Sequence, residues 1–289
     1  MRIAFVTRCL VAALLLFSCG EALAQDSEPS VGKKSSTSSS TPAPPKLKSA
    51  AASKGLVYSR EFFGYYFLHT ASPWGLGASI GTLQTVHKTT FYQFELTEFK
   101  HPRETQREAS IVTSQTSTTG RLFIYGKQNS LIALHAGLGA KYYFSEKSET
   151  KGVAVGMTYS VGPTLGIIKP YYLDIVYPSK STGAYEVRSE GYSAANADKF
   201  LDAGSIVGPS GFTAGLDQTK FTFGGYGKAA LLLDWSAYES FGFALELGAM
   251  MDVYATRVPI AVVGNTTDDN RAIYPNLYLA VHFGRRSYR

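Results

Sequence analysis

Charged residues and cysteines are scarce in this sequence of 289 residues. Only 17% of the residues are Asp, Glu, Lys or Arg, whereas about a quarter is usual for a soluble domain. The two cysteines, Cys9 and Cys19, both lie close to the N-terminus, which excludes a small scaffold held by disulfides. No apolar run reaches the roughly 20 residues that a membrane-spanning helix requires. A helical membrane protein is therefore excluded as well.

The first 24 residues have the three parts of a secretory signal peptide. Arg2 and Arg8 provide the positive start, residues 10–17 the apolar run and residues 22–24 a small-x-small cleavage site. This pattern predicts export and cleavage before residue 25. The alternative is a lipoprotein, because residues 16–19 approach a lipoprotein cleavage sequence in which Cys19 would be acylated. The mass of the mature N-terminal peptide distinguishes the two.

Residues 25–57 form a low-complexity segment. They contain a serine and threonine run at 35–40, four prolines and several lysines, and they have no apolar face to bury. We expect an extended tether in the periplasm, whose lysines either solvate the chain or touch anionic lipid or cell-wall polymer. Residues 58–289 are then the folded domain. The sequence contains no recognisable nucleic-acid-binding module, and a net charge of +6 is weak evidence for one.

From about residue 60 onward, apolar residues alternate with small or polar ones. A period of two predicts β-strands. Most of these segments are longer than the five or six residues usual in soluble proteins, and they match the 9–11 residues that a tilted strand of an outer-membrane barrel needs. The second face is mostly Gly, Ala, Ser and Thr, which suits a narrow barrel interior better than the wet face of a sandwich. The expected strands are residues 61–70, 75–88, 90–100, 130–144, 152–162, 221–235, 241–253 and 276–283.

Aromatic residues near the ends of these segments are expected to form a girdle at the membrane surface. These residues are Tyr142, Phe144, Tyr159, Trp235, Phe241 and Tyr254.

The connections predict how the strands are ordered. Bacterial barrels alternate short periplasmic turns with longer outer loops. The turns near residues 87–90, 145–151 and 236–240 are short, and the connections at 101–129, 165–219 and 255–273 are long. The fold class is therefore all-β: a closed antiparallel transmembrane barrel of about eight strands. Two further pieces, at 122–125 and 171–177, leave ten strands as the alternative.

Several charged or titratable residues fall on the small-residue face and should point into the barrel. A barrel of eight strands is only wide enough to be filled by its side chains, and buried charges must pair or be hydrated. We therefore expect an internal network that plugs the barrel, whereas ten or more strands would favour a narrow pore. The expected network residues are Glu95, His135, Lys141, Lys228, Asp234, Glu246, Asp252 and His282.

The last alternating segment places Leu277, Leu279, Val281 and Phe283 on one face. A final strand that closes on an aromatic residue is the type of ending that the outer-membrane barrel-assembly machinery recognises. This ending departs from the usual form, because residues 284–289 follow Phe283.

Three segments resemble an uncharacterised outer-membrane β-barrel family of Bacteroidetes-type Gram-negative bacteria. They are Phe-Ile-Tyr-Gly-Lys-Gln-Asn at residues 123–129, the block at 162–173, and Phe-Gly-Arg-Arg at 283–286. The resemblance extends from about residue 61 to the C-terminus and implies an outer-membrane barrel. It implies no catalytic residue or substrate. The block at 162–173 is expected at the outer end of a strand and in the loop after it, where Pro163 and Pro170 fix the backbone.

Local patterns that suggest enzymes or metals have simpler explanations. Residues 77–81 match the G-x-S-x-G esterase pattern, but that pattern needs a strand-to-helix elbow, and Ser79 lies in an alternating segment. The five histidines show no metal-ligand spacing. Residues 268–270, Asp-Asp-Asn, either hold a divalent cation or form a polar turn. We predict no cofactor, no metal and no enzymatic activity.

The sequence thus predicts an outer-membrane protein with its N-terminal tether in the periplasm. We expect it to act as a structural or interaction component of an outer-membrane assembly, through its outer loops or its barrel wall. A small channel for hydrophilic solutes is the alternative, and an envelope lipid-modifying enzyme comes third. Expected partners are outer-membrane lipids, the barrel-assembly machinery and another outer-membrane or periplasmic protein.

Overall fold

The computed structural model describes most of the chain from residue 58 onward. The described ranges are 58–85, 87–102, 104–109, 112–113, 116–117, 121–144, 152–178, 185–236, 240–262 and 270–287. All of them belong to the second of two compact units, Ala50–Arg289. The expected signal peptide (1–24), with Cys19, and the tether (25–57) lie outside the described residues. Within the described ranges, no helix has the length and apolar character needed to cross a bilayer.

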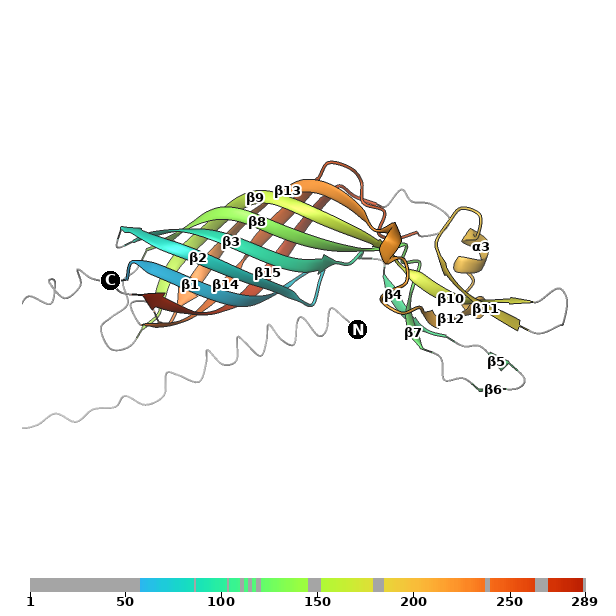
Figure 1. Ribbon diagram of the computed structural model, residues 1–289. Helices are drawn as coiled ribbons and strands as arrows, with labels where there is room; N and C mark the ends of the chain where they lie inside the picture. The colour runs from blue at the N-terminus through green and yellow to red at the C-terminus, as the bar shows by residue number, and fades with distance from the viewer. Residues whose placement is uncertain are drawn as a thin grey trace, which may run out of the picture. The chain divides into compact units, whose positions relative to one another are not determined.

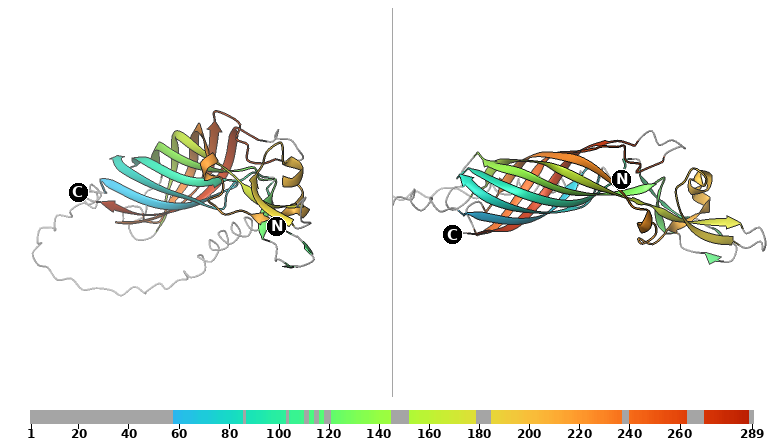
Figure 2. Two further views of the ribbon diagram at one scale, coloured as in Figure 1. Left: turned by 45° about the vertical axis from the view of Figure 1, so that its right-hand side comes forward. Right: turned by 45° about the horizontal axis from the view of Figure 1, so that its top comes forward.

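Eight antiparallel strands form a closed barrel (Figures 1 and 2). Each pairs with its neighbours in the order β1-β2-β3-β8-β9-β13-β14-β15, and β15 pairs back onto β1 from Arg60↔Ser287 to His69↔Tyr278. This confirms the predicted closed barrel of eight strands. The strands are β1 (Arg60–His69), β2 (Gly75–Thr85), β3 (Lys88–Phe99), β8 (Asn129–Tyr143), β9 (Ala154–Pro170), β13 (Lys220–Asp234), β14 (Phe241–Tyr254) and β15 (Ile273–Ser287).

The period of two decides which side chains point inward. On β3, Tyr92 and Phe94 are 63% and 59% exposed, whereas Gln93 and Glu95, which alternate with them, are buried. Small residues on the inward face make room for large ones from neighbouring strands. A Cβ atom at Gly139, for example, would lie 2.4 Å from the ring of Phe91 and 2.6 Å from a backbone oxygen. The many glycines and aromatics of the sequence therefore meet inside the barrel.

The ten-strand alternative and the expected end of β9 were wrong. The pieces at 122–125 and 171–177 are strands, but they lie outside the barrel, so ten barrel strands are excluded. β9 runs on to Pro170, so Pro163 lies within the strand and not at its end. No pairing with β8 occurs beside Pro163, between Leu138↔Val161 and His135↔Thr164, because proline has no N–H to donate.

Two further expectations, about the end of the last strand and about one residue of the aromatic girdle, were also wrong. The last strand does not close on Phe283, because β15 continues to Ser287. Tyr254, expected in the aromatic girdle, is only 3% exposed and belongs to the interior cluster of apolar side chains. Phe144 and Phe241, by contrast, are 65% and 57% exposed.

The connections at one end of the barrel fold into sheets of their own (Figure 1). We call this the loop end, and we call the opposite end, where β1 begins and β15 finishes, the terminal end. Strands β10 (Tyr172–Pro178), β11 (Tyr185–Gly191) and β12 (Ile206–Pro209) form an antiparallel sheet in the order β11-β10-β12, here called the loop sheet. Beside it, β4 (Thr105–Glu108) pairs with β7 (Leu122–Tyr125), and β5 (Val112–Thr113) pairs with β6 (Thr116–Ser117).

Two short helices lie between β11 and β12 along the chain, and a third follows β12. They are α3 (Ala197–Phe200), η1 (Ala203–Ser205) and η2 (Leu216–Gln218). Phe200 of α3 packs with Phe123 of β7, Leu173 and Ile175 of β10 and Ile206 of β12, and all five side chains are almost completely buried. Burial of this much apolar surface stabilises a fold in its own right. The loop end therefore has a hydrophobic core separate from the barrel interior.

Candidate functional site

The middle of the barrel interior contains a cluster of charges around Lys228. Its Nζ atom donates to Glu95 Oε1 at 2.6 Å and lies 3.9 Å from Glu246 Oε1. The Tyr65 hydroxyl donates to the same Glu95 oxygen at 2.7 Å, and the Tyr278 hydroxyl donates to Glu246. Each charge is therefore offset by an opposite charge and by hydrogen bonds, as a buried ion pair requires.

Two histidines extend this middle cluster. His135 Nε2 lies 2.6 Å from Asp252 Oδ1, and His135 Nδ1 lies 3.6 Å from Glu95 Oε2. His282 Nε2 lies 3.3 Å from Glu246 Oε2. The side chains of His135, Glu95 and Asp252 have almost no exposed surface. The cluster is thus packed into the interior and does not line an open path.

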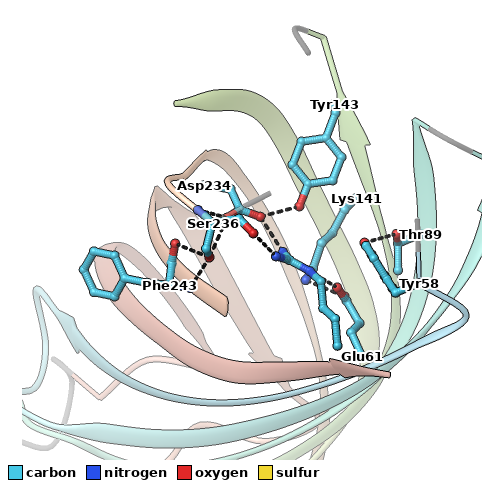
Figure 3. A network of polar contacts seen from close by, with 9 residues as sticks. Tyr58, Glu61, Thr89, Lys141, Tyr143, Asp234, Ser236 and Phe243 are labelled. Atoms are coloured by element: carbon cyan, nitrogen blue, oxygen red, sulfur yellow. Dashed lines mark hydrogen bonds and ion pairs between the residues drawn. The ribbon is translucent and has the colours of Figure 1, made fainter. Parts of the chain in front are cut away.

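A second cluster fills the terminal end (Figure 3). Lys141 Nζ donates to Glu61 Oε1 at 2.6 Å. Asp234 accepts from the Tyr143 hydroxyl at 2.8 Å and from the Ser236 backbone N–H at 3.0 Å. Figure 3 shows these side chains, from β1, β8 and β13, pointing toward one another.

Arg286 of β15 connects the parts of this second cluster. Its guanidinium donates to Asp234 Oδ2 and to the Ser236 carbonyl, both at 2.5 Å, and Nε lies 3.7 Å from Glu61 Oε2. Its side chain is 1% exposed. Because one side chain joins β15 to the β13 end and to β1, Arg286 holds the closing strand of the barrel in place.

The loop end of the interior is apolar. Phe67, Phe99 and Leu131 are completely buried there, together with Val258 and Ile260. The last two come from the segment after β14 and not from a barrel strand. The Ile260 carbonyl accepts from the backbone N–H groups of residues 128 and 129, at the start of β8. This segment therefore packs its apolar side chains against the interior at the mouth of the barrel.

The structure places all eight expected network residues in the interior, each 7% exposed or less. It divides them between two clusters, however. Lys141 and Asp234 belong to the terminal-end cluster, and the other six belong to the middle cluster.

Sequence reasoning missed several members of these clusters. The most important are Glu61 and Arg286. Extending the period of two from His282 by four residues would have placed Arg286 on the inward face. Tyr65, Tyr143 and Tyr278 were missed because tyrosine was expected mainly at the rims.

The four residues expected to form the assembly signal lie on the outward face of β15. Leu277 and Phe283 are 65% and 51% exposed, and Leu279 and Val281 are half-buried.

The patterns that suggested chemistry are placed as follows. Ser79 is buried in the middle of β2, which continues to Thr85, so the strand-to-helix elbow of an esterase is not formed there. Asp268 and Asp269 lie outside the described residues. The Asn270 amide oxygen accepts from the backbone N–H groups of Ile260 and Ala261, so it serves as a loop contact. In the part of the chain that the structure describes, no group of three His, Cys, Asp or Glu side chains is arranged to hold a metal.

Asp174 ties the loop sheet together on the face opposite its core. Its carboxylate accepts from Ser189 Oγ of β11 at 2.5 Å, from Ser210 Oγ at 2.6 Å and from Arg121 Nη2 at 2.6 Å. Burial raises the pKa of this carboxyl group, but the three hydrogen bonds outweigh burial and hold the pKa below its ordinary value. The charged carboxylate therefore stabilises the loop sheet.

We expect Asp174→Ala to destabilise the loop sheet by about 1–3 kcal/mol, because three donors lose their acceptor. Limited proteolysis should cut the loop sheet of the variant faster than that of the wild type. The barrel should stay folded, so that boiled and unboiled samples still migrate differently in detergent gels (heat-modifiable migration). The pKa is lower in the folded state, so the carboxylate's contribution is present above the ordinary pKa of about 3.8 and is lost as the pH falls through the folded value.

Glu186→Ala provides the control for this variant, since Glu186 forms only an exposed ion pair with Arg188, and such pairs contribute little. Equal proteolysis of the Asp174 variant and this control would contradict the role of Asp174.

The fold and its interior define a closed eight-stranded antiparallel barrel with an added sheet at one end. No family model matches the sequence, and no curated relative matches it. The resemblance to a Bacteroidetes-type family is therefore not supported.

The solved structures that are similar to this chain include a β-barrel domain and an attachment invasion protein. The N-terminal β-barrel domain of Pseudomonas aeruginosa OprF is 13% identical, with a TM-score of 0.30, and the match covers 78% of this chain and 97% of that one. Ail, the attachment invasion locus protein of Yersinia pestis, in complex with the heparin analogue sucrose octasulfate, is 9% identical, with a TM-score of 0.33. That match covers 78% of this chain and 94% of Ail. Likeness at this level does not define function.

Proposed function

We propose that this protein is an integral outer-membrane component that binds a partner protein through its loop sheet, with the barrel as its anchor. The observation that carries this proposal is the separate core of the loop end. Long loops of a barrel need no core of their own, and loops of this length are usually functional. Here Leu173, Ile175 and Phe200 are completely buried, so the connection presents a defined surface to a partner.

The outward face of the barrel supports the membrane location. Large apolar side chains project from every barrel strand, including Phe62, Ile80, Leu138, Val161, Phe223, Leu247 and Leu277, each between 51% and 69% exposed. An apolar surface of this extent is the surface that a bilayer covers. In this arrangement the terminal end faces the periplasm, the loop end faces outward, and lipids and the barrel-assembly machinery are the expected partners.

The edge of the loop sheet suggests how a partner binds. β11 pairs only with β10 among the described strands, so its other side offers unpaired backbone groups. Tyr185 and Val187 of β11 are 65% and 56% exposed. An exposed edge strand with apolar side chains is a template for the addition of a partner strand.

Co-purification from native membranes tests this partner surface. We expect the wild-type protein to retain a stoichiometric protein partner, and we expect the variant Tyr185→Ala/Val187→Lys to lose it because the edge contacts are removed. The matched control is Leu122→Ala on β7, where Leu122 is 64% exposed. If the edge variant retains the partner as well as wild type does, the β11 surface is wrong.

The filled interior argues against the alternative of a channel for hydrophilic solutes. Two ionic clusters and an apolar layer occupy the interior in succession, from Arg286 at the terminal end to Phe99 at the loop end. We expect no steady single-channel steps in planar bilayers containing the purified full chain. Steps of constant size that depend on the protein would show that the barrel conducts.

A further inference from the structure

A cleft of about 490 Å³ opens at the loop end, and none of the residues of the two ionic clusters lines it. Five stretches of the chain meet there: the start of β8, the end of β9 with the first residue of β10, the end of β11 with residues 192–193, residue 218 with the start of β13, and residues 256–259 after β14. The interactions proposed for the β11 edge do not require this cleft. It therefore calls for an explanation of its own.

Hydrogen bonds between these segments build the cleft walls. The Asn129 side chain donates to the Pro259 carbonyl at 2.5 Å. The hydroxyls of Thr222 and Thr256 are 3.3 Å apart, and the Ala255 backbone N–H donates to the Phe223 carbonyl at 2.9 Å. The cleft thus exists before any ligand arrives, which lowers the cost of ordering it on binding.

The charge of the cleft has one sign. Lys220 and Arg257 both line it and both are exposed. Among the described residues, neither cation lies within ion-pair distance of a carboxylate, and no Asp or Glu lines the cleft. This contrasts with the barrel interior, where Lys141 and Lys228 each contact a carboxylate at 2.6 Å. Two cations that have no carboxylate partner in the described part of the chain, and that both line a preformed cleft, attract an anion.

The remaining lining is suited to a polar ring and not to a bare ion. Tyr172, Tyr192 and Phe221 contribute aromatic surface, and the side chains of Gln218 and Ser193 contribute hydrogen-bonding groups. Small-molecule sites combine apolar and aromatic walls with a few polar groups in this way. Arginine and lysine together suit phosphate oxygens, since the guanidinium fork can bind two of them.

We propose that this cleft binds a phosphate-bearing saccharide, either free or as the headgroup of a lipid, with Lys220 and Arg257 on the phosphate and the aromatic walls on the sugar. Such binding would be a second function of the loop end, beyond partner binding at the loop sheet. The site lies at the barrel rim, within reach both of solutes outside the membrane and of headgroups at its surface.

Calorimetric titration of the full chain in detergent tests the site. The probes are glucose 6-phosphate, glucose and inorganic phosphate. We expect glucose 6-phosphate to bind best, and we expect Lys220→Gln/Arg257→Gln to weaken it at least about tenfold, because two charge-assisted contacts are lost. Added salt should also weaken it. The control Arg60→Gln/Lys199→Gln removes the same charge from exposed positions outside the cleft and should bind as wild type does.

A second arm of the experiment identifies the source of the ligand. Both proteins are reconstituted into phosphatidylcholine vesicles with or without lipid A, whose headgroup is a phosphorylated disaccharide, and the lipids that remain bound after detergent extraction are quantified. Lipid A retained by wild type and lost from the cleft variant, with no binding of glucose 6-phosphate, assigns the site to a lipid headgroup. Glucose 6-phosphate binding without lipid retention assigns it to a free ligand.

Three results would overturn the proposal. One is equal binding of the sugar phosphate by wild type and the cleft variant, after heat-modifiable migration has shown that both are folded. Another is binding of inorganic phosphate as tightly as glucose 6-phosphate, which would remove the role of the aromatic walls. The third is no binding in either arm.

Discussion

Replacing Lys228 with methionine is expected to lower the free energy of unfolding of the barrel by about 3–5 kcal/mol, the usual cost of removing one partner from a buried ion pair. Methionine fits the space among Tyr65, Phe67 and Tyr278, whose rings surround the ammonium group at 4.4–5.6 Å. It leaves Glu95, however, without a compensating charge in a place with almost no exposure. Urea titration followed by heat-modifiable migration measures the loss.

A companion variant separates the charge from the packing. Lys228→Met/Glu95→Gln removes both members of the pair, and replacing a buried pair with neutral groups is often close to neutral. We therefore expect the double variant to recover more than half of the free energy of unfolding that Lys228→Met loses. The coupling energy between the two sites should be well above the error of measurement. Lys88→Met, at a partly exposed lysine on the outward face of β3, should change much less. Equal losses in the single and double variants would contradict a charge-based role for Lys228.

The fold could be predicted because apolar residues alternate with small or polar residues along each barrel strand. A period of two identifies both the strand and its inward face, so Glu95, Lys228 and Asp252 could each be placed inside without knowledge of any contact. The contacts themselves could not. Glu95 and Lys228 are 133 positions apart in the chain and lie on strands that do not pair. Which inward residues meet depends on the tilt and stagger of the strands, and no local pattern encodes these.

The missed residues lie where the period is ambiguous. On β1, Phe62 and Tyr66 point outward while Phe63 and Tyr65 point inward, so neither face looks polar and Glu61 was not recognised as an interior residue. The loop sheet shows a different limit. Alternation identified the piece at 171–177 as a strand, but the choice between a barrel partner and a separate sheet depends on distant segments. Leu173 and Ile175 are buried against Phe123, which lies on the connection between β3 and β8, and against Ile206, which follows later in their own connection.

Removing residues 284–289 is expected to prevent formation of the closed barrel. Four of the ten residue pairs between β1 and β15, from Arg60↔Ser287 to Phe63↔Gly284, would be lost. Arg286 would go with them, which leaves Asp234 and Glu61 buried without their guanidinium partner. If Phe283 alone at the C-terminus sufficed for assembly, this truncation would be harmless or helpful. The measurement is the fraction of heat-modifiable protein in membranes.

The point variant Arg286→Met separates the lost ion pairs from the lost strand pairing. It keeps all ten β1–β15 pairs but is expected to lower the free energy of unfolding by about 3–5 kcal/mol, because the buried side chains of Asp234 and Glu61 lose their guanidinium partner. Arg285→Gln is the matched control, since Arg285 is exposed on the outward face of the same strand. If the truncated chain fails while Arg286→Met is as stable as this control, strand pairing alone closes the barrel. If the truncated chain does not form the barrel and Arg286→Met forms a less stable one, both features of β15 are needed. Its full length is needed for pairing with β1, and Arg286 is needed for the ion pairs with Glu61 and Asp234.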